Sequence, residues 1–276
     1  MFKFAGYIER CLTAKPILHD AFKSSAERAR MKKILFMMFN KTIGVFLRWS
    51  KSASWEVVRH QYNQPMGVHA LILKKALEDS ASYAISNFSD ALIFRTRKEL
   101  WLHCISRNAP LNTPEGGVIA EFGVWKGESI NFFAKNCPKA KIFGFDSFEG
   151  LEEDWVGTAS PKGTFTTHGE LPKVETNVTL IKGWFENSLP QFVNKNKLGQ
   201  ISLLHMDADS YKPTIFVLNV LKNNLMRGTT VIFDEYFGYP NFQSHEFKAW
   251  REFVASQGIQ YRYVGFTEMQ VALEIL

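Results

Sequence analysis

The sequence has few cysteines, and their spacing gives no disulfide framework. Its 276 residues contain three, Cys11, Cys104 and Cys137. They are odd in number and form no C-x-x-C pair, so neither a disulfide scaffold nor a zinc knuckle is expected. This pattern is typical of proteins of the reducing cytoplasm, and we expect that location here.

The sequence also lacks a convincing signal peptide and a run of apolar residues long enough to cross a bilayer. Glu9 and Arg10 interrupt the first apolar stretch. The most apolar N-terminal stretch, residues 34–49, contains Asn40 and Arg48 and falls short of the roughly 20 apolar residues that a membrane helix needs. Such a stretch would lie on a membrane surface as an amphipathic helix, or pack on the domain or on a second subunit. Peripheral membrane contact and a homo-oligomer are therefore expectations for this segment.

Acidic residues do not balance the basic ones evenly along the chain. Residues 1–60 carry twelve Lys and Arg against four Asp and Glu, a net charge of +8, and the remainder carries −2. A basic segment binds nucleic acid, anionic lipid or an acidic partner, or it is a solvated helical face. Both groups of functions stay open for the N-terminal segment.

The spacing of apolar residues divides the chain into two parts. Residues 1–65 predict helices that end near Pro65 and Gly67. Residues 69–107 again have apolar side chains three to four apart, which predicts helix. We therefore expect a helical N-terminal extension, residues 1–65, followed by a domain of residues 66–276.

Short apolar runs recur after residue 117 and predict seven strands. They are residues 117–122, 141–146, 178–182, 201–207, 229–236, 260–266 and 269–276. Helical stretches, such as 129–136 and 213–226, separate most of them, which predicts a mostly parallel sheet covered on both faces. Only two residues separate the last two runs, so this pair must be an antiparallel hairpin. The pattern predicts a Rossmann-like α/β fold of the class I methyltransferase arrangement.

The turn after the first strand lacks the third glycine of the dinucleotide motif G-x-G-x-x-G. Gly123 would let the backbone turn beside a ligand, and Gly127 would let the next helix approach closely. Glu128 and Ser129 take the place of the third glycine, and a glutamate there would repel a pyrophosphate. The alternative is an ordinary strand–helix turn.

Polar and aromatic residues follow the second and third strands. Asp146 lies about 20 residues after the glycine turn, where an acid accepts hydrogen bonds from ribose hydroxyls. The alternative for Asp146 and Ser147 is an Asx turn or a helix cap. Trp184 and Phe185 would form an apolar slot for an adenine ring, or they pack in the core.

Four acids follow the fourth and fifth strands: Asp207, Asp209, Asp234 and Glu235. Clustered carboxylates repel one another, and a hard divalent cation such as Mg²⁺ would explain the cluster. Such a cation lowers the pKa of a bound hydroxyl and holds its oxygen in place. The alternative is that some of the four acids cap helices or pair with lysines.

Together these motifs resemble those of the macrocin-type O-methyltransferases, class I enzymes that use S-adenosylmethionine. The matching stretches are AEFGVWKGES, FGFDSFEGLEEDW, KGWFENSLP, MDADSYKPT and VIFDEYFGYPNFQSHEFKAWREF, within roughly residues 90–276. The resemblance implies that a set of residues surrounds the cofactor's methionine, ribose and adenine. The set is Glu121, Gly123, Gly127, Ser129, Asp146, Ser147, Trp184 and Phe185, with Arg97 or its neighbour Arg95 at the cofactor carboxylate unless these are solvated helix charges.

The resemblance also implies a metal site at Asp207, Asp234 and Glu235. Relatives usually carry Asp or Asn where Glu235 stands, so a metal-free site is the alternative, and His245 is then a second candidate base. Asp207 is the first candidate for the catalytic base and Asp209 the second. The long polar segment 156–172 and the N-terminal helices are expected to select the acceptor.

The expected function is methyl transfer from S-adenosylmethionine to a hydroxyl of a sugar, a glycan or another small metabolite. An NAD-dependent oxidoreductase and a non-catalytic methyltransferase-like binding module are the alternatives. A nucleic-acid substrate is not expected, because no N-P-P-Y-type tetrapeptide follows the fourth strand and the positive charge lies outside the sheet domain.

Overall fold

A mostly parallel sheet of eight strands forms the centre of the protein. The computed structural model describes residues 67–196 and 198–276. In the sheet the strands have the order β1-β7-β8-β6-β5-β2-β3-β4. Only β8 is antiparallel to its neighbours, β6 and β7. The strands are β1 (Leu92–Ile93), β2 (Val118–Phe122), β3 (Lys141–Asp146), β4 (Val178–Lys182), β5 (Leu203–Met206), β6 (Thr230–Phe233), β7 (Tyr261–Phe266) and β8 (Val271–Ile275).

This sheet confirms the predicted α/β methyltransferase fold with its terminal hairpin, but the count of seven strands was one too few. The additional strand, β1, pairs with β7 at the sheet edge. It lies inside the stretch 69–107, which was predicted to be helical throughout. That stretch instead forms α3 (Val68–Asn87) and α4 (Arg97–Arg107). Thr96 and Glu99 cap each other's backbone N–H in a capping box, so α4 begins anew after the strand.

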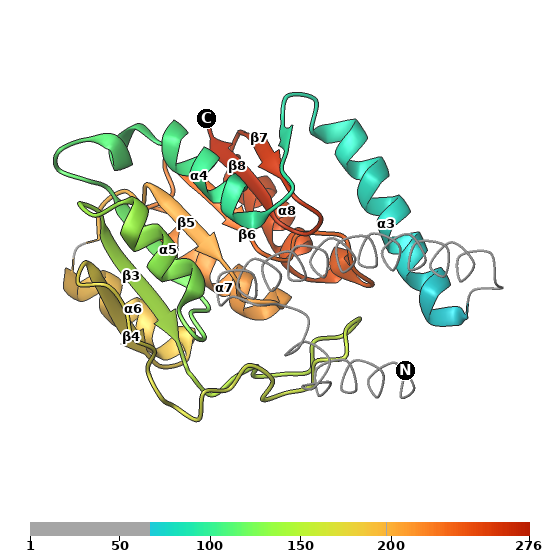
Figure 1. Ribbon diagram of the computed structural model, residues 1–276, viewed down its shortest axis with the longest axis horizontal. Coiled ribbons are helices and arrows are strands. Elements are labelled where there is room, and N and C mark those ends of the chain that lie inside the picture. Colours follow the sequence, from blue (N-terminus) through green and yellow to red (C-terminus); the bar gives the residue numbers. More distant parts are fainter. Residues whose placement is uncertain (1–66, 197) are drawn as a thin grey trace, which may run out of the picture. The chain divides into compact units, whose positions relative to one another are not determined.

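Helices cover both faces of the sheet (Figure 1). On one face, α4 and α5 (Glu128–Asn136) contribute to a core cluster that includes Trp101 and Phe133. A larger cluster lies on the other face and includes Phe192, Val217 and Trp250. These three residues belong to α6 (Phe185–Asn196), α7 (Tyr211–Leu221) and α8 (Glu246–Gln257). Burial of both faces explains why β5, at the centre, has no exposed residue.

The strand order reverses between β2 and β5. Chain order runs outward from β2 to β3 and β4 in one direction, and from β5 to β6 in the other. In open sheets of this kind, ligands bind outside the carboxyl ends of the strands at this reversal. The topology therefore selects the ends of β2, β3, β5 and β6 as the place to look for a site.

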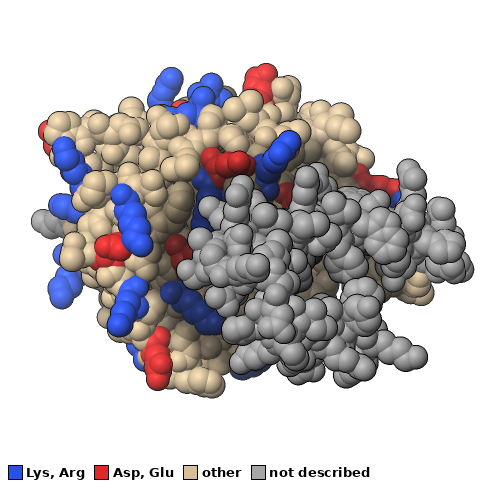
Figure 2. Space-filling model, in the orientation of Figure 1, with Lys and Arg blue, Asp and Glu red and all other residues tan. Residues whose placement is uncertain are grey.

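Several expectations concern residues 1–66, which lie outside the described part of the chain. They are the helical extension, its membrane-surface contact and its role between subunits, and they stay predictions. Within residues 67–276, apart from 197, no helix combines the length and apolarity needed to cross a membrane. Cys104 and Cys137 are buried free thiols. Figure 2 shows basic and acidic side chains interspersed over one face of the described residues.

Candidate active site

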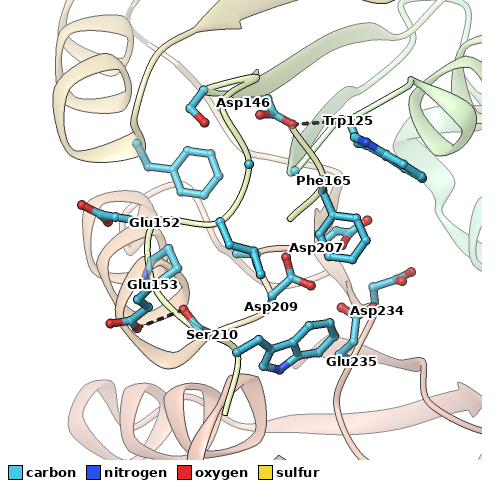
Figure 3. Close-up of a pocket in the computed structure, with 18 of the residues that line it drawn as sticks. Trp125, Asp146, Glu152, Glu153, Phe165, Asp207, Asp209, Ser210, Asp234 and Glu235 are labelled. Carbon is cyan, nitrogen blue, oxygen red and sulfur yellow. Dashed lines mark hydrogen bonds between the residues drawn. The ribbon is translucent and has the colours of Figure 1, made fainter. Parts of the chain in front are cut away.

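A cavity of about 270 Å³ opens at the carboxyl ends of β2, β3, β5 and β6 (Figure 3). Ten of the residues predicted to form the site contribute to its wall. They are Arg97, Gly123, Asp146, Ser147, Trp184, Phe185, Asp207, Asp209, Asp234 and Glu235. The topology thus brings together residues that lie far apart in the sequence, and their individual roles stay predictions.

Gly123 is the point at which the ends of β2 and β5 touch. Its φ of 93° lies in the left-handed region, and a Cβ built on it would collide with the carbonyl oxygen of Asp207. Both the backbone conformation and the close approach therefore require glycine. This contact also fixes where Asp207 stands relative to the turn after β2.

We expect Gly123→Ala to lower the free energy of unfolding by about 2–5 kcal/mol, the sum of left-handed strain and a backbone collision. Gly258→Ala is the matched control. Gly258 also has a positive φ, 66°, but no atom lies within 4 Å of its Cβ position, so only about 1–2 kcal/mol is expected. Urea denaturation measures both. Equal losses for the two variants would contradict the close approach at Gly123.

Asp146 ties the turn after β2 to the end of β3. The backbone N–H groups of Val124 and Trp125 donate to its Oδ2, at 2.8 and 2.7 Å, and the N–H of Phe148 donates to its Oδ1 at 2.6 Å. A carboxylate accepts about four hydrogen bonds, so three are already made and little capacity is left for a ligand. The hydrogen bond from the Phe148 N–H fits the Asx-turn interpretation, and at the cavity one acceptor position is left for a single ribose hydroxyl.

Aromatic side chains form much of the wall, and only two of them were predicted from the sequence. Trp184 and Phe185 follow β4, as predicted. Trp125, Trp155 and Phe165 were missed, although Trp125 lies inside the first turn and the other two lie in or beside the predicted acceptor loop. The rings of Trp125 and Phe165 meet edge to face with centroids 5.5 Å apart. Two separate loops therefore converge at the cavity.

Three residues of the wall have strained backbones. Trp125, Phe165 and Asp209 have φ values of 46°, 67° and 61°, which non-glycine residues seldom adopt. Each costs on the order of 1–3 kcal/mol and persists only where its surroundings hold it. Such strain gathers at functional sites, which supports a functional role for this cavity.

Asp207, Asp234 and Glu235 offer carboxylate oxygens that all lie within 4.8 Å of one another. Burial, and then the charge of Asp234, raises the pKa of both Asp207 and Glu235 well above the ordinary values. Glu235 Oε2 is buried and has no hydrogen-bond partner among the described residues. Three convergent oxygens, one of them lacking any donor, fit a hard divalent cation.

Asp209 lies in the tight turn between β5 and α7 and also faces the cavity (Figure 3). Burial, followed by the charges of Asp234 and Asp146, raises its pKa to about 8. The folded protein then holds a proton that the unfolded chain has already released at neutral pH. This carboxyl therefore favours the unfolded state increasingly as the pH rises from about 4 to about 8.

We expect the Tm of the metal-free protein to fall over this pH range, and to fall less steeply in Asp209→Asn. Calorimetry in the presence of a chelator measures the slope. Asp90→Asn, an exposed change from carboxylate to amide, is the control and should retain the wild-type slope. If the Tm of wild type and of Asp209→Asn fell equally with pH, the structure would not disfavour the ionised form of this carboxyl.

Glu121 does not line the cavity, although it was predicted to contact the cofactor. It is fully buried, accepts a hydrogen bond from Ser129 Oγ at 3.0 Å, and contacts His205 Nδ1 at 3.1 Å. The other nitrogen of His205, Nε2, lies 3.5 Å from Asp234 Oδ1. Ser129, also predicted at the cofactor, is likewise turned towards Glu121 in this buried row of polar contacts. Glu121 is linked to the cavity through His205, which contacts the cavity residue Asp234.

His205 is the cation between Glu121 and Asp234 in this row of polar contacts. Burial alone would lower its pKa, but contacts with Asp234 and Glu121 outweigh burial and raise the pKa to about 10. The same contacts outweigh burial at Asp234 and hold the pKa of that carboxyl below its ordinary value. His205 could not be predicted from the sequence, because it lies in the interior of a strand and its two acidic partners come from β2 and from the residue after β6.

Two more buried polar residues support the strand ends. Glu246, at the start of α8, accepts hydrogen bonds from the backbone N–H of Ala208 at 3.3 Å and of Glu235 at 3.1 Å. Gln270 Nε2 donates to Asp234 Oδ1, the oxygen that also faces His205. Glu246 thus fixes the backbone after β5 and β6, and Gln270 orients the Asp234 carboxylate. Neither residue had a local motif that would have revealed it.

His245 and Gly127 also lie outside the cavity wall. His245 Nε2 is 2.8 Å from the carbonyl oxygen of Val156, and the side chain is buried, so the structure gives no support to a role as base. Gly127 precedes α5 with a φ of 80°. It shapes the turn, and its place there agrees with the alternative of a strand–helix turn.

Arg97 is the only cation in the cavity wall formed by the described residues. Its guanidinium lies 2.6 Å from Glu128 Oε2 and over the ring of Trp101. The pairing with Glu128 explains the glutamate that replaces the third glycine of the turn. Arg97 stays available at the cavity as a partner for a carboxylate.

Comparison with known proteins agrees with this fold. Residues 120–236 match the profile of a family described as a methyltransferase domain. Among solved structures, the calicheamicin methyltransferase CalS11 is 22% identical, with 81% of this chain and 91% of that chain covered and a TM-score of 0.51. The O-methyltransferase NovP is 21% identical, with 64% and 78% covered and a TM-score of 0.49. No curated protein sequence matches the chain.

The matched domain spans the cavity-forming turns from β2 to the end of β6. At 22% identity, the likeness to CalS11 supports the fold and leaves the substrate open. The domain match and the fold together confirm the expected enzyme class, a methyltransferase.

Proposed function

We propose that the protein is an S-adenosylmethionine-dependent O-methyltransferase of the macrocin type, which methylates a hydroxyl of a sugar or another small hydroxylated metabolite. One observation carries the proposal. The cavity at the reversal of strand order places Asp146 and the aromatic pair Trp184–Phe185 on one side and the acids after β5 and β6 on the other. A cofactor subsite and a proton-accepting subsite are thus adjacent.

The residues present fit the proposed cofactor. S-adenosylmethionine carries a sulfonium and an ammonium group and no phosphate, so carboxylates in the wall favour its binding. A dinucleotide would instead bring a pyrophosphate against Asp207, Asp209 and Glu235, and like charges at close range cost free energy. When bound, the cofactor supplies an electrophilic methyl group. The cavity therefore favours a methyltransferase over an NAD-dependent oxidoreductase.

The protein's main contribution to the reaction is alignment and proton removal. Holding both reactants in line is worth up to about 7–11 kcal/mol in favourable models. A sugar hydroxyl is a poor acid, so a base is needed, and a base works best when its pKa lies near the working pH. Burial and neighbouring charge raise the pKa of Asp207 in that direction. Asp207 is our first candidate for the base, and Asp209 the second.

A divalent cation such as Mg²⁺ would be held by Asp207, Asp234 and Glu235, and it would orient the acceptor oxygen and make its proton easier to remove. His205 and Gln270 hold Asp234 Oδ1 from behind, which leaves Oδ2 for a ligand. The exposed rings of Trp125 and Phe165 meet edge to face at the cavity wall.

Ligand-dependent stability tests the proposal. S-adenosylhomocysteine at 100 times its Kd should add about 2.7 kcal/mol to the free energy of unfolding, whereas NAD should add nothing measurable. Stabilisation by NAD alone would overturn the proposed cofactor. Labelled methyl transfer into metabolite extracts, with and without a chelator, then tests catalysis and the metal separately. Cofactor binding without transfer to any extract would favour a non-catalytic binding module.

A further inference from the structure

Trp155 is a buried residue of the cavity wall, unlike the aromatic pair Trp125 and Phe165. It is 7% exposed, whereas the other two are 41% and 39% exposed. The indole nitrogen Nε1 of Trp155 is itself buried, so the surface that the side chain still exposes is carbon. A fixed and apolar ring thus lies in a wall that otherwise contains many carboxyl groups.

Two side chains hold the peptide that follows Trp155. The carbonyl oxygen of Val156 lies 2.8 Å from His245 Nε2 and accepts a hydrogen bond from Asn241 Nδ2 at 3.2 Å. A carbonyl oxygen only accepts hydrogen bonds, so His245 Nε2 carries a proton and is the donor. Both lone pairs of this oxygen are then used, which fixes the peptide plane next to Trp155.

The backbone around Trp155 is held as well. Gly157, with a φ of 100°, approaches the carbonyl oxygen of Pro240 so closely that a Cβ built on the glycine would lie 2.1 Å from it. The backbone N–H of Trp155 donates to the carbonyl oxygen of Ser160 at 2.9 Å. The long loop between β3 and β4 is therefore anchored on the segment between β6 and α8, and Trp155 lies where the two meet.

Trp155 lies on the side of the cavity where the acids after β5 and β6 are found. Its ring meets that of Tyr239 edge to face, with centroids 5.5 Å apart. Burial, and then the charge of Glu246, raises the pKa of the Tyr239 hydroxyl. Glu235 and Asp209, which line the cavity (Figure 3), raise this pKa further and so lie near Tyr239. A ring placed on Trp155 would bring its hydroxyl groups towards these acids.

From this arrangement we propose that Trp155 binds the ring of the acceptor. The apolar face of a hydroxylated ring, such as a pyranose, packs on the indole, and one of its hydroxyl groups faces the acids after β5 and β6. His245 is a positioning residue, because it holds Trp155 through the Val156 carbonyl. The inference rests on the proposed function and adds where the acceptor ring binds. It concerns the ring alone and leaves open the charge of the groups attached to that ring.

Two tryptophan variants separate the acceptor from the cofactor. The rate of labelled methyl transfer is measured in a dilution series of metabolite extract, and calorimetry gives the Kd of S-adenosylhomocysteine. Trp155→Ala should raise the half-saturating extract concentration by about tenfold or more and change the Kd by less than about twofold. Trp184→Ala, on the proposed cofactor side, should do the reverse. An unchanged half-saturating concentration in Trp155→Ala would overturn the inference.

A binding panel tests the same residue without turnover. Methyl glycosides and hydroxylated aromatic compounds are the probes, and saturation-transfer NMR with the full-length protein and saturating S-adenosylhomocysteine shows which kind of ring binds. Trp155→Phe should bind a ring as the wild type does, and Trp155→Leu should bind it about fivefold more weakly, because leucine is apolar but has no flat ring. Equal binding by Trp155→Leu, or no ring binding by a wild type that holds S-adenosylhomocysteine, would contradict the role of Trp155. A wild type that does not bind S-adenosylhomocysteine would instead contradict the proposed function.

Histidine variants distinguish a positioning role from a role as base. His245→Ala should raise the half-saturating extract concentration about 2- to 10-fold, the usual effect of losing one hydrogen bond. His245→Gln should restore it, because its amide can donate to the Val156 carbonyl, and both variants should retain the maximal rate and its dependence on pH. Leu171→Ala, an exposed change in the same loop and outside the cavity wall, is the control and should match the wild type. A maximal rate lowered by about 10²-fold or more in both histidine variants would show that His245 is a base and overturn the positioning role.

Discussion

Asp207→Asn should lower kcat by about 10²- to 10⁴-fold, the usual range for loss of a positioned acid–base group. Binding of S-adenosylhomocysteine should change little, because Asp207 faces the acids after β6 and its backbone, which contacts Gly123, is unchanged. The two effects separate chemistry from cofactor binding. Single-turnover kinetics and calorimetric titration measure them.

The same variant should be as stable as the wild type or more stable when no metal is present. Burial and the charges of Asp234 and Asp209 disfavour the ionised form of Asp207, and an amide removes that repulsion. Asp90→Asn, an exposed change between α3 and β1, is the matched control and should retain wild-type activity. A fully active Asp207→Asn enzyme would remove this residue from the mechanism. A variant that is both inactive and unfolded would contradict the stability argument.

His205→Leu should lower the free energy of unfolding by about 3–5 kcal/mol at neutral pH, because it leaves the buried Glu121 and the largely buried Asp234 without their cation. Glu121 and His205 are both completely buried, so water cannot take over the lost contact at Glu121. Urea denaturation measures the loss. His69→Leu, an exposed histidine of α3, should stay within about 0.5 kcal/mol of the wild type.

The double variant Glu121→Leu with His205→Leu should be less destabilised than the sum of the two single variants. Residues in one buried charge network typically couple by about 0.5–3 kcal/mol. The stabilisation by His205 also has a defined pH dependence. Its pKa in the folded protein, about 10, lies above the value of 6.5 in the unfolded chain, so the stabilisation is complete below pH 6.5 and disappears towards pH 10. Additive losses with no pH dependence would indicate that His205 acts only by packing.

The order of secondary structure elements and the hairpin followed from local pattern. Alternating apolar runs and helical stretches predicted the parallel strands, and the two-residue connection before β8 left only an antiparallel pair. The edge strand β1 was not predicted, because a strand of two residues has no periodicity. The break between α3 and α4 was not predicted, because the helical spacing of apolar residues resumes after the capping box at Thr96.

Residues at strand ends could be assigned to the site because the carboxyl ends of parallel strands meet at one edge of a sheet. That rule correctly predicts that Asp146, Asp207 and Asp234 lie at one cavity. It does not predict in which direction a side chain within a strand points. Glu121 lies one residue before the end of β2, and its side chain turns into the core towards His205, away from the cavity.

Local sequence decided the fold class and the list of acids, because strand periodicity and turn residues act over a few neighbouring positions. Tertiary structure alone decided which acids are charged, since the pKa of each depends on groups that are distant in the chain. Asp234 is held ionised by His205 from β5 and oriented by Gln270 from the turn before β8, while Asp209 is driven towards its neutral form by burial. Electrostatic interactions act through space, so the charge state of this cavity appears only when the sheet has assembled.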